Sequence, residues 1–181
     1  MKPALSLKGF TLIELLIVIS LIIVITGSVI PSFNKYIDNQ NVKQAQETVK
    51  DDLRTIQNKA LNGELAQTEL GSPAAKVNYW GIEFIKGDPT YTYFISVETN
   101  ACGGAGTRED QGTSQPLPGE IVVRSRSSCV FFSFANGDIT SRLSNNTITV
   151  GPNDSVEDNC RRLNVTGNGL IQLESGNGCV P

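Results

Sequence analysis

The chain has 181 residues, enough for one domain and an anchoring segment but too few for two large domains. Its formal net charge of −3, with no long charged run, argues against a general nucleic-acid binder, which usually carries a basic face. It contains no histidine, so serine–histidine and cysteine–histidine nucleophile pairs and histidine-ligated metal sites are excluded. The sequence therefore predicts a non-enzymatic protein with no cofactor, no bound metal and no small-molecule substrate.

The amino end combines a short basic segment with an apolar run. The first nine residues contain Lys2 and Lys8 and no acid. The run from Leu12 to Ile30 would form a helix of roughly 28 Å, about the thickness of the hydrocarbon core of a bilayer. Glu14 lies just inside this run, where a charge is unfavourable unless it has a partner. The pattern predicts a membrane-inserted segment with one acid that must be paired.

A contiguous motif overlaps the start of the run. The residues Lys8-Gly9-Phe10-Thr11-Leu12-Ile13-Glu14 match the processing motif of type IV pilins and type II secretion pseudopilins, and the chain resembles that family. In the family a prepilin peptidase cuts after the glycine and methylates the new amino terminus. The resemblance implies a leader over 1–9, cleavage between Gly9 and Phe10, N-methylation of Phe10, and an assembly contact between Glu14 and the N-terminus of a neighbouring subunit. A plain signal anchor is the alternative.

A second helical pattern follows the apolar run. Pro31 is expected to bend the helix, as a proline does in many members of the family. Beyond it, apolar residues recur mostly every three or four positions, and Asn62-Gly63 is a helix stop. These residues are Phe33, Ile37, Val42, Ala45, Val49, Leu53, Ile56 and Ala60. We expect one long helix over 10–62, transmembrane over 10–30 and amphipathic beyond, with its charged faces in solvent or at a subunit contact.

The remainder, 63–181, has the pattern of short strands separated by turns. Strands are predicted at 79–85, 91–97, 121–123, 130–134, 138–140, 147–150, 162–166 and 170–174. The first two, the pair around Asn136-Gly137 and the last two are expected to form hairpins. Residues 99–119 are predicted to be a long loop. The predicted fold class is α+β, with the long N-terminal helix packed on a mainly antiparallel, type IV pilin-like sheet.

All four cysteines, Cys102, Cys129, Cys160 and Cys179, follow the apolar run, and none forms a CxxC pair. That spacing disfavours a zinc or redox motif and fits two disulfides in an oxidising compartment, with four free thiols as the alternative. Three pairings are possible. Cys102 with Cys129 and Cys160 with Cys179 is favoured because each pair is nearest in sequence.

Segments of the predicted head resemble the GspH/FimT-like minor pilins and pseudopilins: 80–84, 132–137 and 162–169. Some FimT-like pilins bind DNA through arginines in a C-terminal Gly-Arg-x-Arg motif, but this chain has Gly169-Leu170-Ile171-Gln172 at that hairpin. From residue 63 onward there are 8 bases and 13 acids, which also disfavours DNA binding despite the pairs Arg124/Arg126 and Arg161/Arg162. The acidic loop 153–159 is expected to be solvated, with calcium binding as the alternative.

Together, the resemblance implies a structural minor subunit of a type IV pilus or a type II secretion pseudopilus. The implied partners are the prepilin peptidase and methylase, other pilins or pseudopilins, and the inner-membrane assembly platform. The implied location is the inner membrane, as a single-pass protein with its head on the periplasmic or extracellular side, and then the filament. A DNA-binding or adhesive module on the same scaffold is the alternative function.

Overall fold

The computed structural model describes residues 9–63, 77–99, 102, 107–141, 146–153, 159–174 and 179, without the side chains of 28–32 and 141. The predicted leader up to residue 8, the polar segment 64–76 and residues 154–158 of the acidic loop lie outside this description. The chain divides into two compact units, Met1–Asp38 and Asn39–Pro181, and each is described by itself.

The helix α1 (Leu12–Leu61) belongs to the first unit up to Asp38 and to the second unit from Asn39. The helical backbone continues past Pro31, so the predicted kink position does not end the helix. At the other end, the Gly63 N–H donates to the Ala60 carbonyl at 3.1 Å, and Gly63 has a φ of 62°. A glycine in this left-handed conformation satisfies carbonyls of the last turn and terminates the helix, as Asn62-Gly63 predicts.

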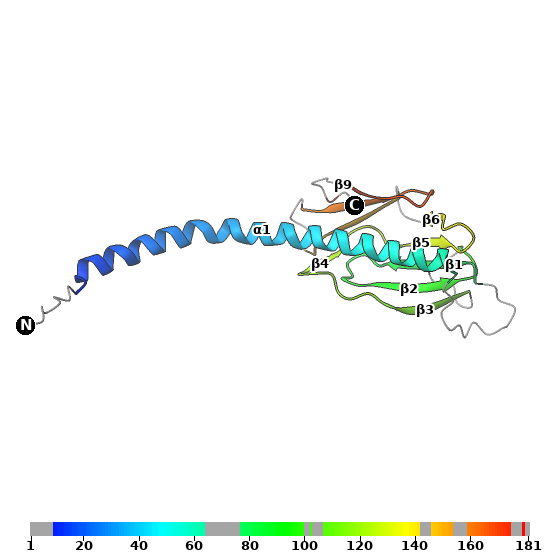
Figure 1. The fold of residues 1–181 in the computed structure, drawn as a ribbon, viewed down its shortest axis with the longest axis horizontal. Coiled ribbons are helices and arrows are strands. Elements are labelled where there is room, and N and C mark those ends of the chain that lie inside the picture. Colours follow the sequence, from blue (N-terminus) through cyan, green and yellow to red (C-terminus); the bar gives the residue numbers. More distant parts are fainter. Residues whose placement is uncertain are drawn as a thin grey trace, which may run out of the picture. The chain divides into compact units, whose positions relative to one another are not determined.

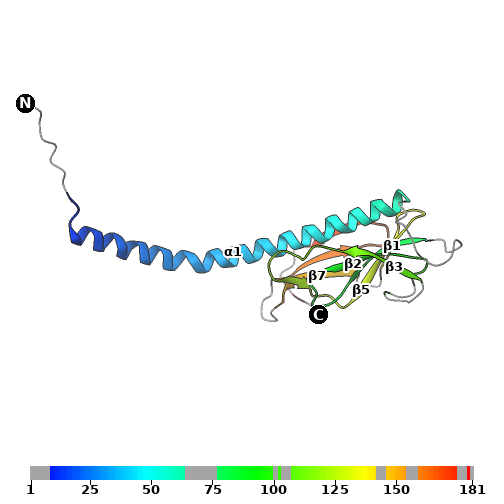
Figure 2. The same cartoon turned by 90° about the horizontal axis from the view of Figure 1, so that it is seen from below.

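Nine strands are assigned among the described residues, in two antiparallel sheets (Figures 1 and 2). The five-stranded sheet has the order β3-β2-β1-β5-β6, and the four-stranded sheet has the order β4-β7-β8-β9. Their bounds are β1 (Tyr79–Phe84), β2 (Tyr91–Ser96), β3 (Arg108–Thr113), β4 (Ile121–Val123), β5 (Ser128–Ser133), β6 (Ile139–Ser141), β7 (Thr147–Pro152), β8 (Arg161–Val165) and β9 (Ile171–Glu174). The three predicted hairpins, β1–β2, β5–β6 and β8–β9, are all present.

The core of the second unit joins the helix to both sheets. One face of α1 from residue 42 onward is buried in the same cluster as side chains from the inner faces of both sheets. The buried helical residues are Val42, Ala45, Val49, Leu53, Ile56 and Ala60, all predicted from their spacing. In Figures 1 and 2 this part of α1 lies along the strands. Burial of this apolar stripe fixes the helical segment on the sheets within the unit.

Two glutamines add polar contacts to this packing. The Gln46 side chain is 2% exposed and donates to the carbonyls of Arg162 at 2.6 Å and Glu174 at 3.3 Å. Three turns further on, Gln57 donates to the carbonyls of Gly137 and Gly169, at 3.3 and 3.2 Å. Each amide therefore connects the helix to two separate backbone segments of the head.

The predicted fold class is wrong. The sequence predicted a long N-terminal helix, transmembrane in its first part, packed on a mainly antiparallel sheet. Among the described residues, no helix is long and apolar enough to cross a membrane. The strands described in the head form two separate sheets, and the unit that contains them begins only at Asn39.

The partition into two sheets depends on long-range strand pairing. After β3 the chain leaves the five-stranded sheet to form β4, returns for β5 and β6, and then adds β7 to β9 to the second sheet. Thus β4 pairs with β7, although β5 and β6 lie between them in the sequence. Local apolar patterns predict that strands exist but carry little information about such distant partners.

The strand β3 was also missed, because 99–119 was predicted to be a loop. Its sequence, Arg-Glu-Asp-Gln-Gly-Thr, has no apolar alternation and is poor in residues that favour strands. It pairs with β2 at the edge of the sheet, with a register shift at Tyr93 and Phe94. Polar, irregular edge strands are common because they hinder unwanted pairing with another chain, and they leave a weak sequence signal.

Candidate functional site

The candidate site is the amino-terminal surface of the chain, from Gly9 through the first part of α1. Gly9 and Phe10 precede the helix as exposed, non-helical residues, and 89% of Phe10 is accessible. A predicted cleavage bond between these two residues is therefore accessible to a peptidase. A Cβ added at Gly9 would meet no atom within 4 Å.

The helix begins with reciprocal hydrogen bonds between Thr11 and Glu14. The Thr11 N–H and the Thr11 hydroxyl donate to Glu14 Oε2, at 3.0 and 2.9 Å. In return, the Glu14 N–H donates to Thr11 Oγ1 at 3.3 Å. This is a capping box, in which an N-cap threonine and a glutamate three residues later satisfy free donors of the first turn.

Sequence reasoning assigned Glu14 to an intersubunit contact and missed this role within the helix. It also missed Thr11 as a functional residue, although the Thr-x-x-Glu spacing before an apolar run is a recognisable signal. Within one chain the carboxylate is thus already hydrogen-bonded. A neighbouring cationic group would have to add to these hydrogen bonds or compete with them.

From Leu15 to Ile25 the helix surface is apolar on all sides except at Ser20. Every side chain described from 9 to 27 and from 33 to 40 is exposed. The large apolar side chains between Leu12 and Ile25 are 49–81% accessible. The sequence has no charged residue between Glu14 and Lys35. An apolar surface of this extent indicates a binding or assembly surface that another molecule covers.

Two polar side chains in this segment are satisfied by the helix itself. The Ser20 hydroxyl donates to the Ile17 carbonyl at 2.8 Å. The Thr26 hydroxyl donates to the carbonyls of Ile22 and Ile23, at 2.7 and 3.2 Å. Neither hydroxyl therefore needs water, and the segment is suited to an apolar environment.

The four cysteines form two disulfides, which confirms the prediction of two disulfides rather than four free thiols. Cys102 is bonded to Cys129 and Cys160 to Cys179, with Cα–Cα distances of 5.5 and 5.1 Å. This is the pairing that proximity in the sequence favoured. The first bond connects the segment before β3 to β5, and the second connects the chain before β8 to the C-terminal segment.

A small hollow in the head lies where α1 meets β1, β2 and β3. It has a volume of about 180 Å³, and Asp52, Lys59, Trp80, Tyr93 and Gln111 are among its lining residues. The Lys59 ammonium lies over the Trp80 ring, 5.2 Å from its centroid. Such a volume accommodates only a few water molecules or a very small ligand.

Beside this hollow, Asp52 Oδ2 accepts hydrogen bonds from the hydroxyls of Tyr91 at 2.5 Å and Tyr93 at 2.7 Å. Burial, followed by the hydrogen bond and charge of Asp52, raises the pKa of both phenols above the ordinary value. Both tyrosines are therefore neutral donors at physiological pH. This arrangement joins the helix to β2.

The arginines considered for DNA binding do not form one exposed cluster. Arg124 donates to the carbonyls of Pro152 at 3.2 Å and Asn153 at 3.1 Å, so its guanidinium stabilises the end of β7 and the residue that follows it. Arg126 is exposed, whereas Arg161 and Arg162 are half-buried on β8.

Comparisons with protein-family models, with curated proteins and with solved structures found no match.

Proposed function

We propose that the chain is a structural minor subunit of a filament of the type IV pilus or type II secretion pseudopilus class. The observation that carries the proposal is the exposed apolar helical segment that begins with the Phe10-Thr11-Leu12-Ile13-Glu14 motif. In a filament, equivalent segments from neighbouring subunits cover one another. The capping box and the internally bonded hydroxyls suit this segment to such an interior.

In this proposal a prepilin peptidase cleaves between Gly9 and Phe10 and methylates Phe10. The new amine of one subunit then lies beside Glu14 of its neighbour. Because opposite charges in an apolar interior must be paired, this contact sets the axial register of adjacent helices. Other pilins or pseudopilins and a platform at the inner membrane are the proposed partners.

Two further features support an exported head. The two disulfides are of the kind that persists in oxidising compartments outside the cytoplasm. The described head contains arrangements that stabilise the fold, at Asp52, Gln46 and Gln57, which is consistent with a structural role.

The test combines intact-mass spectrometry with an assembly assay on Glu14→Gln. The wild-type protein should begin at a methylated Phe10, and Glu14→Gln should be processed but enter sheared filaments several-fold less. Glu47→Gln is the matched control, because Glu47 is exposed on the same helix in the head unit. A mature protein that begins at Met1 or beyond Ile25 contradicts the processing step. Wild-type assembly of Glu14→Gln contradicts the charge pair.

A further inference from the structure

A second apolar cluster lies on the five-stranded sheet apart from the main core. Phe94, Cys129 and Phe131 are fully buried there, with Tyr79 and Cys102 packed against them. The Phe94 and Phe131 rings meet edge to face, with centroids 5.4 Å apart. The first disulfide, Cys102–Cys129, is thus part of a small core formed by β1, β2, β5 and the chain before β3.

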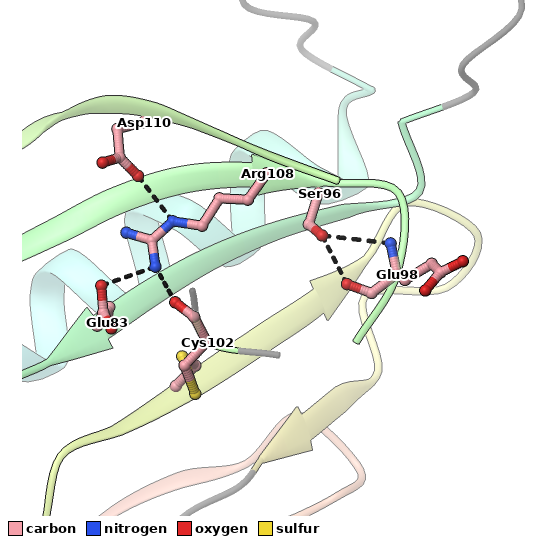
Figure 3. The surroundings of a disulfide bond; sticks show 7 residues. Glu83, Ser96, Glu98, Cys102, Arg108 and Asp110 are labelled. Atoms are coloured by element: carbon pink, nitrogen blue, oxygen red, sulfur yellow. Dashed lines mark hydrogen bonds and ion pairs between the residues drawn. A yellow bond between two sulfur atoms is a disulfide. The ribbon is translucent and has the colours of Figure 1, made fainter. Parts of the chain in front are cut away.

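The Arg108 side chain, 9% exposed, lies on this cluster and makes four contacts, of which those to Glu83, Asp110 and Cys102 are drawn in Figure 3. Its guanidinium carbon lies 4.2 Å from the centroid of the Phe94 ring. Nη1 is 2.7 Å from Glu83 Oε2, and Nε is 2.7 Å from Asp110 Oδ1. Nη1 also donates to the backbone carbonyl of Cys102. The fork of an arginine can meet these acceptors at once, whereas the single ammonium of a lysine cannot.

These contacts connect the two halves of the first disulfide. Glu83 on β1 is the register partner of Cys129 on β5, so Arg108 is anchored beside Cys129. The same guanidinium holds the carbonyl of Cys102. Arg108 therefore contacts the backbone of Cys102 and also contacts Glu83, the cross-strand neighbour of Cys129.

We propose that Arg108 is a positioning residue that directs Cys102 to Cys129 and so selects this pairing from the three that four cysteines allow. The proposal is independent of filament assembly. Once β1, β2, β3 and β5 have paired, the guanidinium binds the Cys102 carbonyl and holds its thiol over Cys129. This raises the effective concentration of one thiol at the other.

The chemical step is thiol–disulfide exchange with a small external disulfide. Cys102 is half-buried and Cys129 is fully buried, so the Cys102 thiolate attacks the external disulfide and releases one thiolate. The Cys129 thiolate then attacks the Cys102 sulfur and releases the second. The two protein thiols lose two electrons and two protons in total, and the external disulfide becomes two thiols. The adjacent guanidinium also favours the thiolate over the thiol.

The test is oxidative refolding of the reduced full chain in detergent micelles with a glutathione redox buffer. Free thiols are blocked at equilibrium, and each disulfide-linked peptide is quantified by mass spectrometry. In Arg108→Gln, the equilibrium constant of the first disulfide against glutathione should fall about tenfold or more, because hydrogen bonds to charged groups are lost. The second disulfide, Cys160–Cys179, is the internal reference and should be unchanged. Arg126→Gln, which alters an exposed arginine of the same head, should leave both unchanged.

Three results would overturn the proposal. Two concern Arg108→Gln: an unchanged equilibrium constant of the first disulfide, or an equal fall in the equilibrium constants of both disulfides. The third is a wild-type equilibrium constant in Arg108→Lys, since the positive charge alone would then suffice. If Arg108→Gln does not refold, Asp110→Asn replaces it, because the Asp110 side chain is 60% exposed and its loss perturbs the core little. That variant should weaken the first disulfide by about threefold. No change in Asp110→Asn would likewise overturn the proposal.

Discussion

The two hydrogen bonds of the Gln46 amide should contribute measurably to the free energy of unfolding, because they attach α1 to the head. Gln46→Met keeps the length of the side chain but removes the donor to two carbonyls, those of Arg162 and Glu174. Because the site is 2% exposed, water cannot easily replace the amide. An unsatisfied buried polar group costs about 1–3 kcal/mol, so we expect a loss of about 2 kcal/mol in the free energy of unfolding. For a chain of this size, that loss corresponds to a fall in Tm of about 4–8 °C.

The assay is urea unfolding of the full chain in micelles, followed by the fluorescence of Trp80. This is the only tryptophan of the sequence, is 2% exposed and lies under Lys59 of α1, so its emission reports detachment of the helix. Gln57→Met is the matched comparison, since both bonds of Gln57 are longer than the 2.6 Å bond of Gln46 and lie at a half-buried site where water can enter. Its cost should be about 1 kcal/mol or less. An equal or smaller cost for Gln46→Met would refute the reasoning.

Two further predictions concern the five-stranded sheet. Gly81→Ala would put a methyl group inside contact distance of the Phe94 ring and should lower the free energy of urea unfolding by about 1–3 kcal/mol. Gly167→Ala is the control and should be nearly neutral, because the atom nearest to its added Cβ lies at 3.8 Å. Equal losses in the two variants would contradict the packing argument. The pKa of Tyr93 is raised by burial and by Asp52, so its contribution to stability is complete below the unfolded pKa of about 10 and is lost as the pH rises through the folded pKa. Tyr93→Phe should therefore give a shallower fall of Tm above about pH 10, and an unchanged slope would exclude this tyrosine as a cause.

The apolar surface of the candidate site could be predicted from the sequence, whereas the roles given to Gly9, Phe10 and Glu14 stay predictions. The roles of Gly9, Phe10 and Glu14 were predicted from a contiguous motif, and the apolar surface of the helix was predicted from composition alone. Thr11 was missed although its spacing from Glu14 carries the signal of a capping box. Arg108 could not be identified, because Glu83 and Phe94, which it contacts, lie on two other strands. An isolated basic residue in a polar segment is most often a solvated side chain.

The sequence by itself determined the individual elements: the helix stop at Asn62-Gly63, most of the strands, the three hairpins and the stripe of α1 that is buried from Val42 onward. Phe33 and Ile37, which belong to the same predicted stripe, are exposed. These features depend on residues close together in the chain, where periodicity and turn residues act directly. Only the tertiary structure decided that there are two sheets, that β4 pairs with β7, and that the polar residues 108–113 form an edge strand. The physical reason is that a strand's partner is selected by the burial and hydrogen bonding of distant segments, and a short apolar pattern fits many such partners.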